Sequence, residues 1–232
     1  MQQGKIVILT GAGISAESGL GTFRDAGGLW SQVRIEDVAT PEAFARDPAR
    51  VHDFYNGRRA QAASAEPNPA HHALARLQAR HPGGVVIVTQ NVDNLHERAG
   101  AEVLHMHGEL AAALCARCDH RWPAPEEMGA DTPCPACGAP AARPDVVWFG
   151  EMPYRMEEIA GHLQDAALFV AIGTSGQVYP AAGFVEEARL CGAETLELNL
   201  DASDVSRAFD RHAVGKASEI VPAWVEEVLG GA

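Results

Sequence analysis

The sequence predicts an α/β protein with a Rossmann-like, doubly wound parallel sheet and a smaller cysteine-rich insertion. Short apolar runs that suit buried strands alternate along the chain with helical patterns. Nearly every apolar run ends in glycine or a polar residue, and such strand ends are where ligands bind in open α/β sheets. One segment with four cysteines interrupts this alternation, which indicates a separate insertion.

Length and charge exclude several kinds of protein. The 232 residues suit one domain, or one large domain with a small insertion. The 18 basic and 31 acidic residues give a net charge of −13, which argues against nucleic-acid binding, because that affinity comes from Lys and Arg at phosphates. The apolar runs are far shorter than the about 20 residues that a membrane-spanning helix needs, and no signal peptide is evident. We therefore expect a cytoplasmic protein with reduced cysteines.

The first predicted strand, residues 5–10, runs directly into the turn Gly11-Ala12-Gly13. A strand, a glycine turn and a helix start are typical of a phosphate site, because the helix start offers N–H groups and the positive end of its dipole. Gly11 would permit the tight turn, and Gly13 would let the backbone approach a ligand closely. The same pattern also occurs without a ligand, so by itself it leaves both interpretations open.

The next segment argues against redox chemistry. A redox Rossmann unit carries a second short strand that ends in Asp or Glu about 20 residues further on. Residues 27–34 are instead glycine-rich and polar, with no buried strand. A nucleotide cofactor is still expected, whereas hydride transfer is disfavoured.

Helices and strands alternate along the rest of the chain. Thr40 followed by Pro41 is a helix start signal. Further helices are expected over residues 51–65, 70–79, 155–164, 181–190 and 222–229. Strands are expected over residues 85–89, 102–107, 146–150, 167–172 and 194–199. Because the ends of parallel strands meet at one edge of a sheet, the polar residues that follow these strands predict a ligand site there.

Two Cys-x2-Cys pairs form the most specific metal signal in the chain. They are Cys115 with Cys118 and Cys134 with Cys137. Two such pairs can place four thiolates around one Zn²⁺, and disulfides are a poor alternative in a reducing compartment. Four protein ligands close the coordination sphere, so we expect one structural zinc per chain that takes no part in catalysis. Cys191 lies on an apolar helical stretch and is expected in the core.

Among the ten histidines, His107 is the favoured general base. It ends a predicted strand on the face where Asn91, Asp93 and Ser175 also gather, and imidazole can take a proton near neutral pH. His105 lies two residues earlier and therefore on the same side of the strand. The sequence does not separate the two histidines.

Taken in order, these motifs resemble the sirtuins, a family of NAD-dependent protein lysine deacylases. The match extends from about Ile6 to Val228, and it includes residues 11–19, 22–24, 89–93, 107–108, 147–151 and 173–175 with the two cysteine pairs. The resemblance implies a Rossmann-like large domain of residues 1–35, 81–110 and 145–232. It also implies a small domain, composed of a helical insertion (residues 36–80) and a zinc-binding insertion (residues 111–144).

The resemblance also implies NAD as a consumed co-substrate and an acylated lysine, in a peptide or protein, as the substrate. His107 would be the general base, assisted by Asn91 and Asp93, and His105 a supporting residue. In the family mechanism the acyl oxygen attacks C1′ of the ribose, nicotinamide leaves, and a ribose hydroxyl takes up the acyl group. The implied NAD contacts are Gly11, Ala12, Gly13, Ile14, Ser15, Glu17, Thr22, Phe23, Arg24, Trp30, Gln90, Asn91, Asp93, Gly173, Thr174, Ser175, Asn199, Leu200, Asp201 and Ala217. The implied substrate contacts are Tyr55, Arg58, Val147, Trp148, Phe149, Gly150 and Val178, of which residues 147–151 and Val178 would pair with the peptide as an added strand.

Tyr55 and Arg58 bear on the choice of acyl group. They lie three residues apart, so a helix turns both to one face. Arginine presents a fork of donors that suits a carboxylate, and a tyrosine hydroxyl can complete the contact, although a solvated helix face is the alternative. This Tyr-x-x-Arg resembles the class III sirtuins, which remove succinyl and malonyl groups. We expect both deacetylase and desuccinylase or demalonylase activity, while Gly21 and Gly57 depart from the family pattern and leave loop order and acyl preference open.

Two alternatives remain at this point. An NAD(P)-dependent oxidoreductase would explain the glycine turn but not the cysteine pairs, Asn91 or Asp93. A non-catalytic zinc protein that binds NAD or acylated lysine would leave His107 without a role, and mono-ADP-ribosyl transfer is a weaker variant on the same cofactor. The sequence does not fix the oligomeric state, and a monomer is compatible with it.

Overall fold

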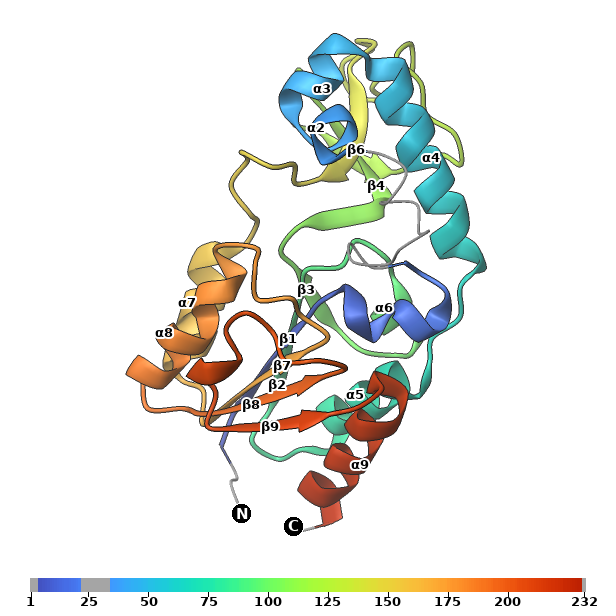
Figure 1. The fold of residues 1–232 in the computed structure, drawn as a ribbon. Coiled ribbons are helices and arrows are strands. Elements are labelled where there is room, and N and C mark those ends of the chain that lie inside the picture. The colour runs from blue at the N-terminus through green and yellow to red at the C-terminus, as the bar shows by residue number, and fades with distance from the viewer. Residues whose placement is uncertain (1–3, 22–33, 231–232) are drawn as a thin grey trace.

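The protein is described by a computed structural model that covers residues 4–21 and 34–230 (Figure 1). Its centre is a six-stranded sheet in the order β3-β2-β1-β7-β8-β9, in which every neighbouring pair of strands is parallel. The strands are β1 (Ile6–Thr10), β2 (Val85–Thr89), β3 (Val103–His105), β7 (Leu168–Ile172), β8 (Glu194–Asn199) and β9 (Arg211–Val214). The predicted fold class, a Rossmann-like parallel sheet with a cysteine-rich insertion, is confirmed.

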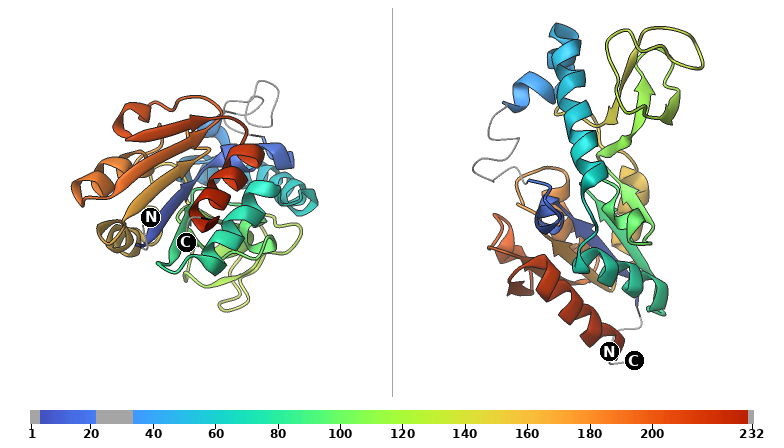
Figure 2. Two further views of the ribbon diagram at one scale, coloured as in Figure 1. Left: turned by 90° about the horizontal axis from the view of Figure 1, so that it is seen from below. Right: turned by 90° about the vertical axis from the view of Figure 1, so that its right-hand side faces the viewer.

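Helices cover both faces of this sheet (Figure 2). They are α5 (Pro69–Arg80) and α9 (Ala217–Gly230) on one face, and α7 (Met156–Gln164) and α8 (Phe184–Leu190) on the other. Successive side chains of a strand alternate between faces, so Ile6 and Ile8 enter the core under α5 and α9. Val7 and Leu9 enter the core under α7 and α8. Burial on both faces explains why β1 is a continuous apolar run.

A smaller lobe lies at one end of the sheet (Figure 1). It contains the helices α2 (Ile35–Val38), α3 (Pro41–Arg46) and α4 (Pro48–Ser64), and an antiparallel sheet of β4 (Gly108–Cys115), β5 (Arg121–Pro123) and β6 (Ala142–Val146). The hydroxyl of Thr40 accepts a hydrogen bond from the Ala43 N–H at the start of α3, as the start signal predicted. The helix α5 lies with the large sheet beside α9, although the sequence had placed residues 36–80 together.

The structure corrects the sequence analysis at four places. Residues 147–150 do not continue the large sheet, because β6 ends at Val146 and belongs to the small lobe. The last helix begins at Ala217 and not at Pro222. The strand β9 was not predicted, because all four of its residues are exposed and it forms no apolar run. Cys191 is exposed at the end of α8, where the chain turns towards solvent, and so it is not a core residue.

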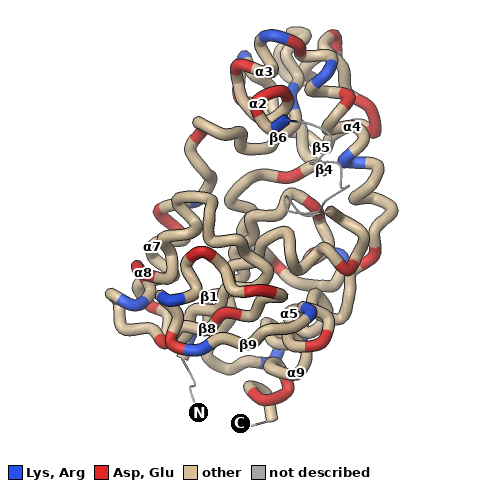
Figure 3. Tube along the Cα trace, in the orientation of Figure 1, with Lys and Arg blue, Asp and Glu red and all other residues tan. Residues whose placement is uncertain are grey.

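Charged residues are distributed over both parts of the molecule. Asp and Glu occur on the large sheet's helices and loops and on the small lobe, with Lys and Arg between them (Figure 3). None of the helices within residues 4–21 and 34–230 combines the length and the apolar character that crossing a membrane requires.

Candidate active site

The candidate site lies where the parallel strands end. Four loops meet there: residues 11–15 after β1, 90–93 after β2, 173–175 after β7 and 199–201 after β8. The chain leaves β1 towards β2 on one side and later returns to β7 on the other side. A crevice at such a topological switch point is the usual ligand position in open α/β sheets. The prediction that the polar strand ends share one edge is confirmed.

The glycines of the first loop have a packing role that was not predicted. The loop forms two short 3₁₀ turns, η1 (Ala12–Ile14) and η2 (Ala16–Ser18), where an α-helix was expected. The N–H of Gly13 donates to the Gly173 carbonyl at 2.9 Å, and a Cβ on Gly13 would lie 2.7 Å from the Gly173 Cα. The missing Cβ therefore lets two loops of the site pack together, and the space is filled by Gly173.

Ser15 links this loop to the two predicted catalytic polar residues. The Asn91 side-chain N–H donates to the Ser15 hydroxyl at 3.1 Å and to the Gly11 carbonyl at 3.2 Å. The Ser15 hydroxyl donates in turn to the Asp93 carboxylate at 3.2 Å. All three side chains are buried, and burial raises the pKa of the Asp93 carboxyl although its hydrogen bonds from Leu95 N–H and Ser15 act in the opposite direction. Asn91 and Asp93 are thus fixed by the glycine-rich loop.

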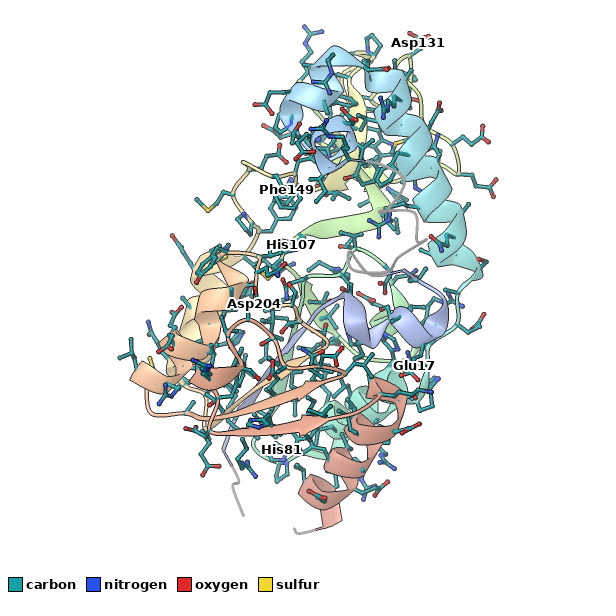
Figure 4. The ribbon with its side chains drawn as sticks, viewed as in Figure 1. Glu17, His81, His107, Asp131, Phe149 and Asp204 are labelled. Carbon is teal, nitrogen blue, oxygen red and sulfur yellow. The ribbon has the colours of Figure 1, made fainter. Side chains whose placement is uncertain are left out.

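His107 has the surroundings of a base that is neutral at physiological pH. It follows β3 in the turn before β4, and so it does not end the strand as predicted. Its Nδ1 lies 3.0 Å from the Gln90 carbonyl, which can only accept, so Nδ1 carries the proton and Nε2 keeps its lone pair. Burial lowers the pKa of His107, and the Gln90 carbonyl only partly offsets this effect. The side chain lies between the small lobe and the sheet, near Phe149 (Figure 4).

His105 is in the opposite electrostatic situation. Its Nδ1 lies 3.0 Å from the Asn91 carbonyl and its Nε2 lies 2.6 Å from the Glu97 carboxylate. Burial alone would lower the pKa of His105, but the hydrogen bond and charge of Glu97, together with Glu109 and the Asn91 carbonyl, raise it overall. Both ring nitrogens of His105 already face oxygen acceptors, whereas Nε2 of His107 keeps its lone pair, so the two environments favour His107 over His105 as the base.

The loops after β7 and β8 are joined to each other, and the segment after β1 is joined to α9. The Asn199 side-chain N–H donates to the Thr174 carbonyl at 2.7 Å, and the Asp204 N–H donates to the Ser175 carbonyl at 3.1 Å. The Glu17 carboxylate accepts hydrogen bonds from the N–H and hydroxyl of Ser218, at 2.9 and 2.8 Å. Glu17 therefore binds the start of α9, next to Ala217. Four predicted cofactor contacts, Thr22, Phe23, Arg24 and Trp30, lie outside the described residues.

Some supporting residues were not predicted from the sequence. The Asn68 side-chain N–H donates to the Ile14 carbonyl at 2.7 Å and thus connects the first loop to the start of α5. Thr10, at the end of β1, contacts Thr89 at 2.9 Å and the His96 ring at 3.1 Å. Burial lowers the pKa of His71 to about 4 and that of His96 well below its ordinary value. The only sequence signal for this buried layer is a threonine at the end of each of two apolar strands.

Arg58 reaches the predicted catalytic region from the small lobe. A hollow between α4 and the large sheet is lined by Leu20, Gly21, Arg58, Gln61, Ala62, Asp93 and Leu110. Arg58 and Asp93, far apart in the sequence, therefore face the same hollow. Burial lowers the pKa of Arg58, whereas the charges of Tyr55 and Asp93 raise it.

Tyr55 is held by Trp148. The Trp148 indole N–H donates to the Tyr55 hydroxyl at 3.0 Å, and the guanidinium carbon of Arg143 lies 3.5 Å from the centroid of the Trp148 ring. Burial raises the pKa of Tyr55 to about 12, with Arg58 and the Trp148 hydrogen bond acting against it. The hydroxyl is therefore protonated at every working pH and can act as a donor.

The segment predicted to pair with a peptide already uses several of its N–H groups. Val147 donates to the His107 carbonyl at 2.9 Å and Phe149 to the Ala39 carbonyl at 3.0 Å. Trp148 donates to the Glu151 carboxylate at 2.8 Å. A peptide strand added beside this segment would pair with its carbonyl groups or with N–H groups beyond these three.

The four paired cysteines are positioned to bind one metal ion. Their sulfur atoms all lie within 4.8 Å of one another, and the Sγ–Sγ distance is 3.7 Å both for Cys115 with Cys137 and for Cys118 with Cys134. Four sulfurs arranged tetrahedrally at about 2.3 Å from Zn²⁺ are separated by roughly 3.8 Å. The geometry therefore fits the predicted structural zinc, which these four thiolates would hold.

The fold and the site together define a class: an α/β protein with a nucleotide-type site at a sheet switch point and a four-cysteine metal site in its small lobe. A family model described as the Sir2 family matches residues 11–180. The chain belongs to the Sir2 family.

Comparisons with known proteins agree. A Caulobacter vibrioides protein named NAD-dependent protein deacylase is 55% identical over 230 residues, which covers 97% of each chain. A protein of the same name from Escherichia coli O6:H1 is 53% identical and covers 100% of this chain and 86% of its own. A solved Sir2 homologue in complex with NAD is 37% identical with a TM-score of 0.90, covering 98% of this chain and 90% of that one.

Proposed function

We propose that this chain is an NAD-dependent protein lysine deacylase that transfers the acyl group to ADP-ribose and releases nicotinamide. One arrangement at the switch point carries the proposal. His107 keeps a lone pair on Nε2, and Asn91 and Asp93 are held in place by hydrogen bonds to Ser15. The deacylase name shared by relatives at 53–56% identity supports it.

NAD would lie along the edge formed by the loops after β1, β2, β7 and β8. When bound, it supplies the ribose carbon from which nicotinamide leaves and the hydroxyl that takes up the acyl group. The polar side chains and the remaining main-chain groups of residues 11–15, 173–175 and 199–201 would bind and orient it. Residues 90–93 would surround the nicotinamide ribose, and His107 would take a proton from its hydroxyl at Nε2. Glu17 would contribute by fixing the start of α9 near the adenosine end.

The two-lobe arrangement supports the proposed division into a large and a small domain, except that α5 packs with the large sheet and not with the small lobe. In it, residues 111–144 form the zinc-binding part of the small domain, and a structural zinc there would hold the lobe that carries the acyl-lysine contacts. The protein's location in the cytoplasm remains a prediction made from the sequence alone.

We further propose that Arg58 and Tyr55 select acyl groups that end in a carboxylate, such as succinyl and malonyl. Arg58 lines the hollow that also contains Asp93, so an acyl chain that reaches His107 and Asp93 would end near the guanidinium. The Tyr55 hydroxyl accepts from Trp148 and keeps its own proton to donate.

Both proposals are tested with NAD and peptides that carry acetyl-lysine or succinyl-lysine, analysed by mass spectrometry. We expect nicotinamide, free lysine and an acyl-ADP-ribose product, without formation of NADH. His107→Ala should abolish turnover and retain peptide binding, while the exposed control His72→Ala should retain activity. Full activity of His107→Ala would contradict the assigned base, and NADH formation would favour an oxidoreductase.

The acyl preference is tested separately with Arg58→Met. We expect kcat/KM for the succinyl peptide to fall roughly 30-fold, because a charge-assisted pair is lost. This fall corresponds to a loss of about 2 kcal/mol of transition-state stabilisation. The acetyl peptide should change little. Equal losses on the two peptides would contradict a role for Arg58 in binding the carboxylate.

A further inference from the structure

His105 is unusual because both of its ring nitrogens face groups that can only accept hydrogen bonds. Nδ1 faces the Asn91 carbonyl at 3.0 Å and Nε2 faces the Glu97 carboxylate at 2.6 Å. A neutral imidazole has one N–H, so it would leave one of these contacts as a lone pair facing an oxygen. Only the doubly protonated ring satisfies both partners.

The groups around His105 favour its charged form on balance. Glu97, on α6 (Leu95–Arg98), Glu109, on β4, and the buried Asp93 are acidic, and His96 on α6 is the opposing titratable group. His96 is buried and its pKa is lowered well below its ordinary value, so it is neutral near pH 7 and does not repel a charge on His105. The His105 side chain is itself only 8% exposed.

The two contacts of His105 join the loop that carries the proposed catalytic residues to the helix that follows it. The Asn91 carbonyl that His105 binds belongs to the residue whose side chain binds Ser15 and Gly11. The Glu97 end is anchored on α6, which begins just after Asp93. His105 therefore connects both ends of the short segment that carries Asn91 and Asp93.

We propose that His105, as a doubly protonated cation, is a positioning residue that holds the segment of residues 91–97 in the shape that binds NAD. It acts through Asn91 and Asp93 and does not exchange protons with the substrate. The proposal rests on the proposed function for the place of NAD beside Asn91 and Asp93. Loss of the second proton removes one of the two hydrogen bonds, so NAD affinity falls as the pH rises through the pKa of His105.

The test measures NAD binding by calorimetry, without peptide, from pH 6 to pH 10, together with the ¹⁵N imidazole shifts of His105. In the wild type we expect a doubly protonated His105 at pH 7 and a Kd for NAD that rises about tenfold at alkaline pH, as for loss of one hydrogen bond to a charged group. Glu97→Gln keeps an acceptor and removes its charge, so it should move the alkaline rise to lower pH by about one unit or more.

Two further variants make the test specific. His105→Asn should weaken NAD binding at pH 7 by about tenfold and abolish the alkaline rise. Glu102→Gln removes a nearby exposed charge whose side chain does not contact His105, and it should leave the profile unchanged. A neutral His105 at pH 7, or a profile that Glu97→Gln does not move, would overturn the proposal. NAD binding is measured without peptide, so its outcome does not depend on deacylation. A failure to deacylate peptides would refute the proposed function, but it would produce neither a neutral His105 nor an unmoved profile.

Discussion

The contact between Gly13 and Gly173 gives a prediction whose size follows from the structure. Gly13→Ala places a Cβ 2.7 Å from the Gly173 Cα and 2.9 Å from the Gly173 oxygen, whereas ordinary contact begins at 3.4 Å. The two loops must therefore separate by about 0.7 Å, a distance that overpacked sites accommodate only at a cost. No side-chain rotation can relieve this contact, because the atoms that Cβ meets belong to the main chain.

The backbone around Gly173 has little freedom to move away. Gly173 has a φ of +63°, and its N–H donates to the Leu198 carbonyl at 3.0 Å while its carbonyl accepts from Gly13. We expect Gly13→Ala to lower the free energy of unfolding by about 2 kcal/mol, within the usual range for overpacking. The KM for NAD should rise several-fold, because both displaced loops belong to the proposed cofactor site.

Gly57→Ala is the matched control with the opposite sign. Gly57 lies inside α4, and a Cβ there would meet nothing within 4 Å. Alanine in a helix interior is favoured over glycine by about 0.5–1 kcal/mol, so this variant should be more stable than the wild type. Urea unfolding and NAD kinetics on both variants provide the measurement. Equal stability changes in the two variants, or an unchanged KM for Gly13→Ala, would refute the reasoning.

Three other predictions concern the metal, pH and α9. Metal analysis should find close to one zinc per chain, and Cys134→Ser should abolish binding and destabilise the small lobe; a metal-free protein that tolerates chelator would contradict this. His71 has an ordinary pKa in the unfolded state, whereas burial lowers its pKa to about 4 in the folded protein. The free energy of unfolding should therefore fall as the pH drops from 6.5 to about 4, by at most about 3 kcal/mol for this group. In unfolding measurements His71→Gln should flatten that slope. Ser218→Ala should raise the KM for NAD two- to fivefold, because Glu17 loses one of its two hydrogen bonds to α9. The kcat should be nearly unchanged, because ground state and transition state lose the same binding energy. A fall in kcat alone would contradict a role in cofactor binding.

Much of the fold could be predicted because its signals are local. The strands β1, β2 and β7 are short apolar runs buried on both faces, and such runs have few alternatives in an α/β chain. The cysteine pairs are equally local, since their spacing alone brings two thiolates together. The polar residues after the strands could be placed at one edge because the topology of a parallel sheet requires it.

The tertiary structure decided which residues act and why. His105 and His107 are two residues apart and chemically identical, and each faces a backbone carbonyl at Nδ1. They differ at Nε2, which faces the Glu97 carboxylate only in His105. Gly13 was predicted to let a ligand approach, and the structure adds that Gly173, 160 residues away in the sequence, packs directly against it. Burial and hydrogen-bond partners arise from contacts between distant segments, so local sequence patterns do not predict them. The sequence by itself determined most strands of the large sheet, the candidate metal ligands and the edge of the sheet at which a ligand is expected. Only packing determined the partners of each histidine and the close approach at Gly13.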